Sequence, residues 1–253
     1  MKTNTINFLF FFFLSSISIY SQNLDHYAKA KVSYVVNLNL DKNVKKHKVV
    51  FDAFPEKVAK IQSIDSEFDF TLVFNDSISI FYLEKKLYSD NSAASIATVF
   101  MNYFGRIKQK SKNYITEELE EAFGKFLVSR PYQKWELHDE TKTIGDYTCF
   151  KAKTFYTTTN PKGKVFKHDF TAWYTPQLPY KFGPAGYGNL PGLIIELQGN
   201  EFTYGVKKIQ FYDEDEKSKR NEIPKLKNKK LITEVEFERL AAEDEKRWRD
   251  NNH

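Results

Sequence analysis

The sequence has little of three things that would narrow its function: cysteine, charge of one sign and long hydrophobic runs. Its one cysteine is Cys149, among 253 residues. A chain with one cysteine cannot form an internal disulfide, so the stability of the fold must come from its core. We expect Cys149 to be a small buried side chain rather than a reactive thiol, because cysteine is among the most frequently buried residue types.

The charge excess is small. There are 38 Lys and Arg residues against 33 Asp and Glu, a formal net charge of +5. A nucleic-acid-binding surface needs basic residues gathered on one face, so we expect no nucleic-acid partner.

The only long apolar run is at the N-terminus, where residues 1–21 are typical of a secretory signal peptide. Lys2 supplies the positive charge, Ile6 to Leu14 is almost wholly apolar, and Ser21 is a small residue at the expected cleavage site. The apolar core is shorter than the roughly 20 residues that span a bilayer. We therefore expect export across the inner membrane to the periplasm or outer envelope, with no integral membrane segment left after signal removal.

Motifs for cofactors, metals and catalysis are not found. No Gly-Lys-Ser/Thr or Gly-x-Ser-x-Gly sequence occurs, and no two of the five histidines are spaced as zinc ligands. We expect no cofactor, no metal and no catalytic residue. A hydrolase or metal protein would require His138, His168 or Cys149 to converge in the fold; ordinary strand residues are the simpler interpretation.

What the chain does have is strand-like alternation. Residues 67–74 and 77–83 flank Asn75-Asp76, the pattern of a β-hairpin. The pattern shows no alternation of strands with helices, so we do not expect a parallel sheet. The same period-2 pattern predicts further strands over 27–40, 126–128, 134–142, 146–156, 165–174, 193–197 and 202–212.

These patterns predict a mainly β (α+β) fold with one β-rich domain over residues 22–212. We expect a curved, open antiparallel sheet, half-barrel-like, with one or two packing helices, by analogy with periplasmic lipoprotein carriers. Residues 92–104 fit either a helix or a strand. Thr116 is expected to cap a short acidic helical turn.

From residue 213 to 253 the composition changes, and 23 of these 41 residues are charged. Asn221 to Lys230 is expected to be a linker, with Pro224 as a breaker. Thr233 followed by Glu236 is a capping-box pattern, which predicts a charged C-terminal helix.

Glycine and proline are scarce, ten and eight residues, yet nine of them lie between Pro176 and Gly199. Such a concentration predicts a long loop whose path is set by the backbone, and loops of this kind tend to be functional. Its aromatic side chains cannot all be buried in regular structure, so we expect them to form a contact surface. The candidate ligand- or partner-binding residues are Trp173, Tyr174, Tyr180, Phe182 and Tyr187.

The loop also carries a specific motif. The run GNLPGLIIEL, preceded by WYTPQLPYKFGPAGYG, resembles the GLPGLI family of exported proteins from Gram-negative envelopes. The resemblance covers about residues 135–212, and Asn189 departs from the motif's lead-in. It implies an exported protein and brings no catalytic residues. The residues that we assign to this structural motif are Gly183, Pro184, Gly188, Leu190, Pro191, Gly192, Leu193 and Ile194.

Three functional hypotheses follow. The first is a non-enzymatic carrier that holds an apolar or lipid-like ligand in a cavity of several hundred Å3. The second is an envelope scaffold, which would expose an apolar patch on the loop and dock on a membrane receptor. The third is the hydrolase or metal protein. If Gly192 has a positive φ, Gly192→Val should damage folding.

Overall fold

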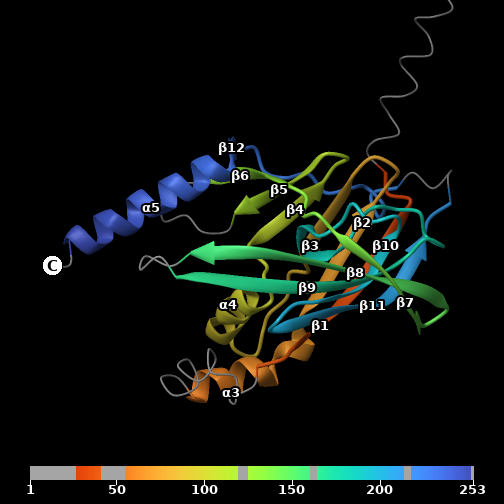
Figure 1. Ribbon diagram of the computed structural model, residues 1–253, viewed down its shortest axis with the longest axis horizontal. Coiled ribbons are helices and arrows are strands. Elements are labelled where there is room, and N and C mark those ends of the chain that lie inside the picture. The colour runs from red at the N-terminus through yellow and green to blue at the C-terminus, as the bar shows by residue number, and fades with distance from the viewer. Residues whose placement is uncertain (1–26, 41–54, 119–124, 160–163, 214–217, 252–253) are drawn as a thin grey trace, which may run out of the picture.

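The computed structural model describes residues 27–40, 55–118, 125–159, 164–213 and 218–251 (Figure 1). The expected signal peptide, residues 1–21, lies outside these ranges. In the described chain the helices are α3 (Pro55–Ser63), α4 (Asn91–Phe100) and α5 (Glu234–Asn251), with short 3-10 turns η2 (Asp65–Glu67) and η3 (Pro184–Gly186). None of these helices is long and apolar enough to cross a membrane.

The described strands form one open twelve-stranded sheet in the order β12-β6-β5-β4-β3-β2-β1-β11-β10-β9-β8-β7. All neighbours are antiparallel except β12, which runs parallel to β6, so the sheet is mixed rather than purely antiparallel. The prediction of a mainly β fold with an open sheet is confirmed. The strands are β1 (Ala30–Leu38), β2 (Asp69–Phe74), β3 (Ser79–Leu83), β4 (Gly105–Gln109), β5 (Asn113–Glu118), β6 (Phe126–Pro131), β7 (Glu136–Ile144), β8 (Tyr147–Thr159), β9 (Val165–Thr175), β10 (Leu193–Gln198), β11 (Phe202–Phe211) and β12 (Lys230–Thr233).

The centre of the sheet is packed with aromatic rings. The Phe70 ring lies 5.3 Å from Phe81 and 5.1 Å from both Tyr103 and Tyr204, measured between ring centroids. These distances are those of favourable stacked and edge-to-face pairs. The Tyr204 hydroxyl donates to the Met101 carbonyl oxygen at 2.9 Å, which joins the end of α4 to the sheet. Burial holds the pKa of Tyr204 well above its usual value, so the ring stays neutral.

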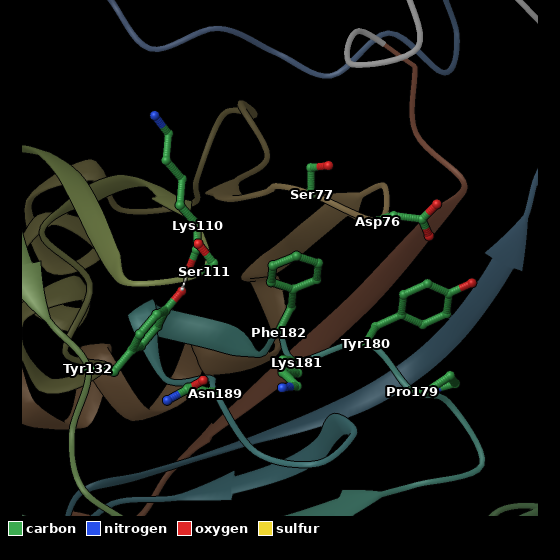
Figure 2. Close-up of a pocket in the computed structure, with 10 residues that line it drawn as sticks. All are labelled: Asp76, Ser77, Lys110, Ser111, Tyr132, Pro179, Tyr180, Lys181, Phe182 and Asn189. Atoms are coloured by element: carbon green, nitrogen blue, oxygen red, sulfur yellow. Dashed lines mark hydrogen bonds between the residues drawn. The ribbon is translucent and has the colours of Figure 1, made fainter. Parts of the chain in front are cut away.

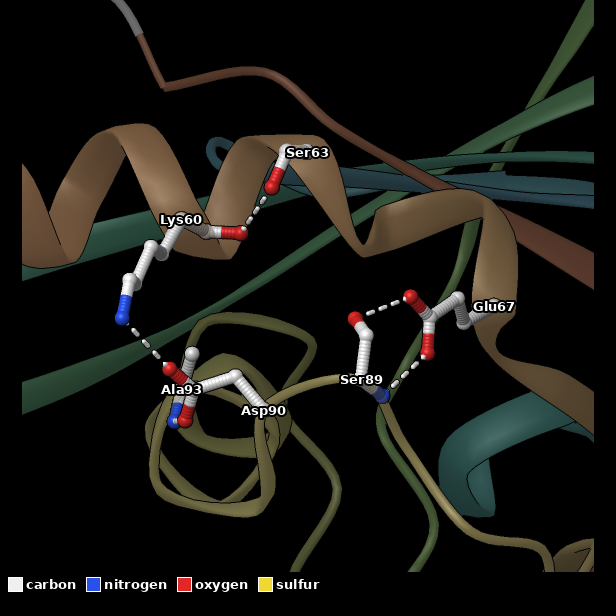
Figure 3. Close-up of polar contacts among 6 residues, drawn as sticks. All are labelled: Lys60, Ser63, Glu67, Ser89, Asp90 and Ala93. Carbon is white, nitrogen blue, oxygen red and sulfur yellow. Dashed lines mark hydrogen bonds and ion pairs between the residues drawn. The ribbon is translucent and has the colours of Figure 1, made fainter.

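The helices α3 and α4 lie side by side at one end of the sheet (Figure 1). Their polar links are drawn in Figure 3: Lys60 reaches Asp90 at 3.0 Å, and Glu67 accepts from both the backbone amide and the hydroxyl of Ser89. Asp90 also caps α4 by accepting from the Ala93 amide at 2.9 Å. The hydrogen bonds from Ser89 and Ala93 lower the pKa values of Glu67 and Asp90.

One expectation for local structure was wrong, and one open alternative was decided. Residues 113–118 form strand β5, with Thr116 buried, rather than an acidic helical turn. Pairing with β4 and β6 overrides the local helical signal, as tertiary contacts often do. For residues 92–104, where the sequence fitted either a helix or a strand, the structure has the helix α4, which ends at Phe100.

The C-terminal segment is more firmly attached than a linker would be. Glu222 forms a bridge with Tyr27, and the Ile223 side chain is 5% exposed. The chain then pairs with β6 as β12 before α5 begins. The Thr233 half of the capping box is present, since the Thr233 hydroxyl accepts from the Glu236 amide at 3.2 Å. The Glu236 carboxylate pairs with Lys230 at 3.4 Å, and α5 projects away from the sheet (Figure 1).

Candidate functional site

The Gly/Pro-rich connection between β9 and β10, residues 176–192, crosses the inside of the curved sheet; we call it the strap. Its central turn η3 contacts β3, β4 and β5, which lie on the other side of β1 in the strand order. The strap therefore joins two halves of the sheet that are not neighbours. A segment at this depth must find partners for its backbone polar groups.

Gln109 of β4 supplies the main partners, and its side chain is fully buried. Its amide nitrogen donates to the Tyr187 carbonyl oxygen at 2.9 Å, and its carbonyl oxygen accepts from the Gly183 amide at 3.2 Å. Ser79 of β3 donates its hydroxyl to the same Gln109 oxygen at 3.0 Å. Trp135 adds a further bond from its indole nitrogen to the Gly188 carbonyl oxygen at 2.9 Å.

Glycine is needed in the strap for two different reasons. Gly186 has a φ of +83°, and a Cβ there would meet the Tyr114 ring at 2.7 Å. Gly192 has no positive φ, so the condition that we attached to Gly192→Val is not met. A Cβ at 192 would instead lie 2.1 Å from the Thr175 carbonyl oxygen, so close approach is what requires glycine there. Asn189 departs from the motif at a residue with a φ of 64°, a conformation that asparagine tolerates.

The aromatic residues that we expected to form a contact surface are mostly core residues. Phe182 is 6% and Tyr187 2% exposed, and Trp173 and Tyr174 are also buried. Tyr187 packs on Phe170 of β9, with 4.7 Å between the ring centroids. The expectation failed because the loop passes through the interior instead of over the surface.

Tyr180 alone of the five is partly exposed, and it packs on Phe74 with 4.5 Å between the ring centroids. The motif residues, like the aromatic ones, are mostly buried. All but Pro191 are buried, namely Gly183, Pro184, Gly188, Leu190, Gly192, Leu193 and Ile194. The motif therefore encodes the strap and its return into β10, where the Ile194 amide donates to the Phe182 carbonyl oxygen at 3.1 Å.

Two cavities lie beside the strap. The first, which we call the loop cavity, has a volume of about 660 Å3 and is drawn in Figure 2. Strap residues Tyr180, Lys181 and Phe182 line it together with the β2–β3 and β4–β5 turns. The acidic residue in its lining, Asp76, is already paired, since its carboxylate lies 2.5 Å from the Lys29 ammonium.

The second cavity, which we call the mouth cavity, has a volume of about 590 Å3. Its lining comes from β4, β5 and β6 at one end of the strand order and from β8 at the other, which means that the sheet curves around it. The strap forms part of its wall through Ala185 and Tyr187. Other aromatic and aliphatic lining residues are Phe104, Ile107, Tyr114, Phe155 and Tyr156.

Polar groups converge on the same cavity. The Gln133 side-chain oxygen is buried and has no hydrogen-bond partner among the described residues, while its amide nitrogen donates to the Tyr114 hydroxyl at 3.4 Å. Arg130 lies 3.3 Å from Glu234 at the start of α5. A concave site with aromatic walls and a few such polar groups is the usual form of a ligand-binding site.

The groups that a hydrolase or metal site would require do not converge. His138 lies opposite Lys151 of β8, and His168 opposite Tyr156, five residues further along the same strand. At about 3.4 Å per residue these two positions are roughly 17 Å apart along β8. Burial raises the pKa of the Cys149 thiol to about 11, which keeps it protonated at neutral pH.

Comparison with protein families gives one match. The model of a family described as a protein of unknown function (Porph_ging) matches residues 163–196. The matched segment contains β9, the strap and the start of β10, so it coincides with the part of the chain that crosses the sheet. No curated protein matches the sequence.

Among solved structures, the chain is similar to PNGF-II in two crystal forms. The P21 form is 12% identical with a TM-score of 0.46, and the C2 form is 13% identical with a TM-score of 0.43. The matches cover 86% and 85% of this chain but only 34% and 33% of the PNGF-II chains. The chain thus spans about a third of the length of these structures.

Proposed function

We propose that this protein is a non-enzymatic binding protein of the bacterial envelope, exported by residues 1–21, and that its ligand occupies the mouth cavity. The observation that carries the proposal is the lining of this cavity, which combines the rings of Tyr114, Tyr156 and Tyr187 with a buried Gln133 oxygen that has no partner among the described residues. The sequence from Trp135 to Tyr212, which contains the strap, supports membership of the GLPGLI family.

The ligand must be narrow and partly polar. A carrier that buries a whole acyl chain needs an empty apolar interior, but Phe70, Phe81 and Tyr204 already fill the centre of the sheet. The strap occupies more of that space through Phe182 and Tyr187. What remains open is the mouth cavity, whose lining includes both polar and aromatic side chains, so an amphipathic ligand fits better than a purely apolar one.

The scaffold hypothesis is the second candidate. It is favoured by Phe211, 49% exposed, whose ring lies 6.5 Å from that of the partly exposed Tyr180 beside the loop cavity. These two rings are a much smaller surface than the expected patch, because Phe182 and Tyr187 are buried. The mouth cavity is therefore the stronger site.

Native mass spectrometry of the mature protein, purified from the periplasm of its host, tests the proposal. We expect a bound mass that solvent extraction removes. Thr158→Trp places a large ring in the mouth cavity and should abolish the bound mass, whereas Thr141→Trp, on exposed β7 outside the cavity, should retain it. A bare polypeptide mass in every sample, or equal ligand retention by the two variants, would contradict the proposal.

A further inference from the structure

The β8–β9 hairpin extends beyond the strands that flank it. β7 pairs with β8 only as far as Lys153, and β10 pairs with β9 only from Thr171 onward. The backbone of residues 154–159 in β8 therefore has β9 on one side and, among the described residues, no strand on the other. A strand edge of this kind presents a row of N–H and C=O groups that can pair with another chain.

This edge differs from the other edges of the sheet. Natural proteins usually blunt exposed edges with charges, bulges or proline. β7 has a break in register between His138 and Thr141 and carries acidic residues around it. The extended part of β9 carries the ion pair between Lys167 and Asp169, at 2.6 Å.

Residues 154–159 have none of these protections. Their sequence, Thr-Phe-Tyr-Thr-Thr-Thr, contains no charge and no proline, and its three residue types all favour strands. The register against β9 runs without a shift from Phe150 to Thr159. The segment is a regular strand edge with nothing in its sequence that discourages pairing.

The unblunted edge forms a wall of the mouth cavity, with the Phe155 side chain 56% exposed. Phe155, Tyr156, Thr157 and Thr158 all line it. Gln133 also lines the cavity, and its side-chain oxygen is an acceptor with no partner among the described residues. Its neighbour Lys134 accepts a hydrogen bond from the Thr154 hydroxyl at 2.8 Å, so Gln133 lies near the start of this edge. A ligand there meets alternating backbone donors and acceptors along β8 and a further side-chain acceptor.

From this arrangement we infer that the ligand of the mouth cavity is an extended polypeptide segment, which adds to the free edge of β8 as a further strand. Only another peptide backbone matches the alternation of N–H and C=O groups along an edge; an acyl chain cannot. Six residues at about 3.4 Å each give an edge of roughly 20 Å, so the bound segment is about six residues long.

The cavity also predicts which side chains the segment carries. Alternate residues of an added strand point to the same face, as they do in the sheet itself. The side chains that point inward meet Tyr114, Tyr156 and Tyr187, so apolar or aromatic residues are expected at every second position. This inference rests on the proposed function, because it names the ligand class of the same cavity.

The test starts from a random heptapeptide library displayed on phage and selected on the mature protein. A selected peptide is synthesised, and its affinity for Thr158→Trp and for the control Thr141→Trp is measured. We expect the peptide to lose at least tenfold in affinity for Thr158→Trp alone. Amide exchange followed by NMR should slow at least tenfold at alternate residues of 154–159 when the peptide binds.

Two further peptides make the test independent of any protein variant. Each is N-methylated at alternate residues, one at the odd and the other at the even positions. Only one set of N–H groups faces β8, so one methylated peptide should bind at least tenfold more weakly and the other should bind as before. Equal affinities of the two, whether kept or lost, would overturn strand addition.

The outcomes separate this inference from the proposed function. If no peptide is selected, or if a peptide binds without slowing exchange at 154–159, the inference is wrong. The proposed function still stands in that case if the native protein carries a bound mass that Thr158→Trp abolishes. If that bound mass is absent while a selected peptide protects the β8 edge, strand addition stands and the proposal of a ligand that stays bound in the purified native protein is contradicted.

Discussion

Replacement of Gln109 by methionine should destabilise the protein strongly, because this one side chain satisfies two buried backbone groups of the strap. Methionine has nearly the same length and shape, so the change removes hydrogen bonds without opening a large cavity. It leaves the buried Gly183 amide and the Tyr187 carbonyl without the partners that now lie at 3.2 and 2.9 Å. Each orphaned buried group costs about 1–3 kcal/mol.

The expected loss in the free energy of unfolding is therefore about 2–6 kcal/mol. For a chain of this size, a loss of about 3 kcal/mol lowers the melting temperature by roughly 6–12 °C. Urea denaturation and calorimetry measure both quantities, and Gln210→Met, an exposed glutamine on β11, is the matched control. A loss below about 1 kcal/mol for Gln109→Met would refute the reasoning, because it would mean that water reaches the strap.

Three more predictions follow from named contacts. Gly192→Ala should prevent folding or lower the melting temperature by more than about 10 °C, because its Cβ would clash with the Thr175 backbone. Gly205→Ala, where a Cβ meets nothing within 4 Å, should have no such effect, and equal melting curves of the two variants would contradict this prediction. Cys149, buried with a pKa raised to about 11, should react with Ellman's reagent at pH 8 only after unfolding in urea; rapid reaction of the native protein would show that the thiol is accessible. Hydrogen bonds lower the pKa values of Glu67 and Asp90, so these bonds stabilise the fold while both carboxyl groups are ionised. This stabilisation is complete above the unfolded-state pKa values of about 4, and it is lost as the pH falls through the lower folded-state pKa values. The double variant Glu67→Gln, Asp90→Asn should thus melt below wild type at pH 7 and approach wild type as the pH falls below the unfolded-state values; a constant difference would count against the assignment.

The parts of the fold that local patterns encode could be predicted from the sequence. Alternation over residues 27–40 predicted a strand, found as Ala30–Leu38, and the Asn75-Asp76 pair predicted the turn of a hairpin. The capping box at Thr233 predicted the start of α5. Each of these signals lies within a few residues of the structure that it specifies.

The site could not be predicted in the same way, because it depends on contacts between distant residues. Gln109 and Gly183 are 74 residues apart, and nothing near either one indicates that the strap passes through the interior. The free edge of β8 arises because β7 stops short of the end of the hairpin, which is a property of two strand lengths together. The concentration of glycine and proline located the important segment but suggested an exposed surface rather than a buried strap.

The most direct test of the account is native-state hydrogen exchange at the strap amides of Gly183 and Asn189 and at the amide of Ile194 in β10, which bonds to the strap. Each donates a hydrogen bond, to Gln109, Lys181 and Phe182 respectively. If the strap is part of the core and the mouth cavity is the binding site beside it, these amides exchange only through global unfolding, with protection of about 10⁴-fold or more. Exchange within seconds would mean that the strap opens locally as an exposed docking loop, and the account would be contradicted.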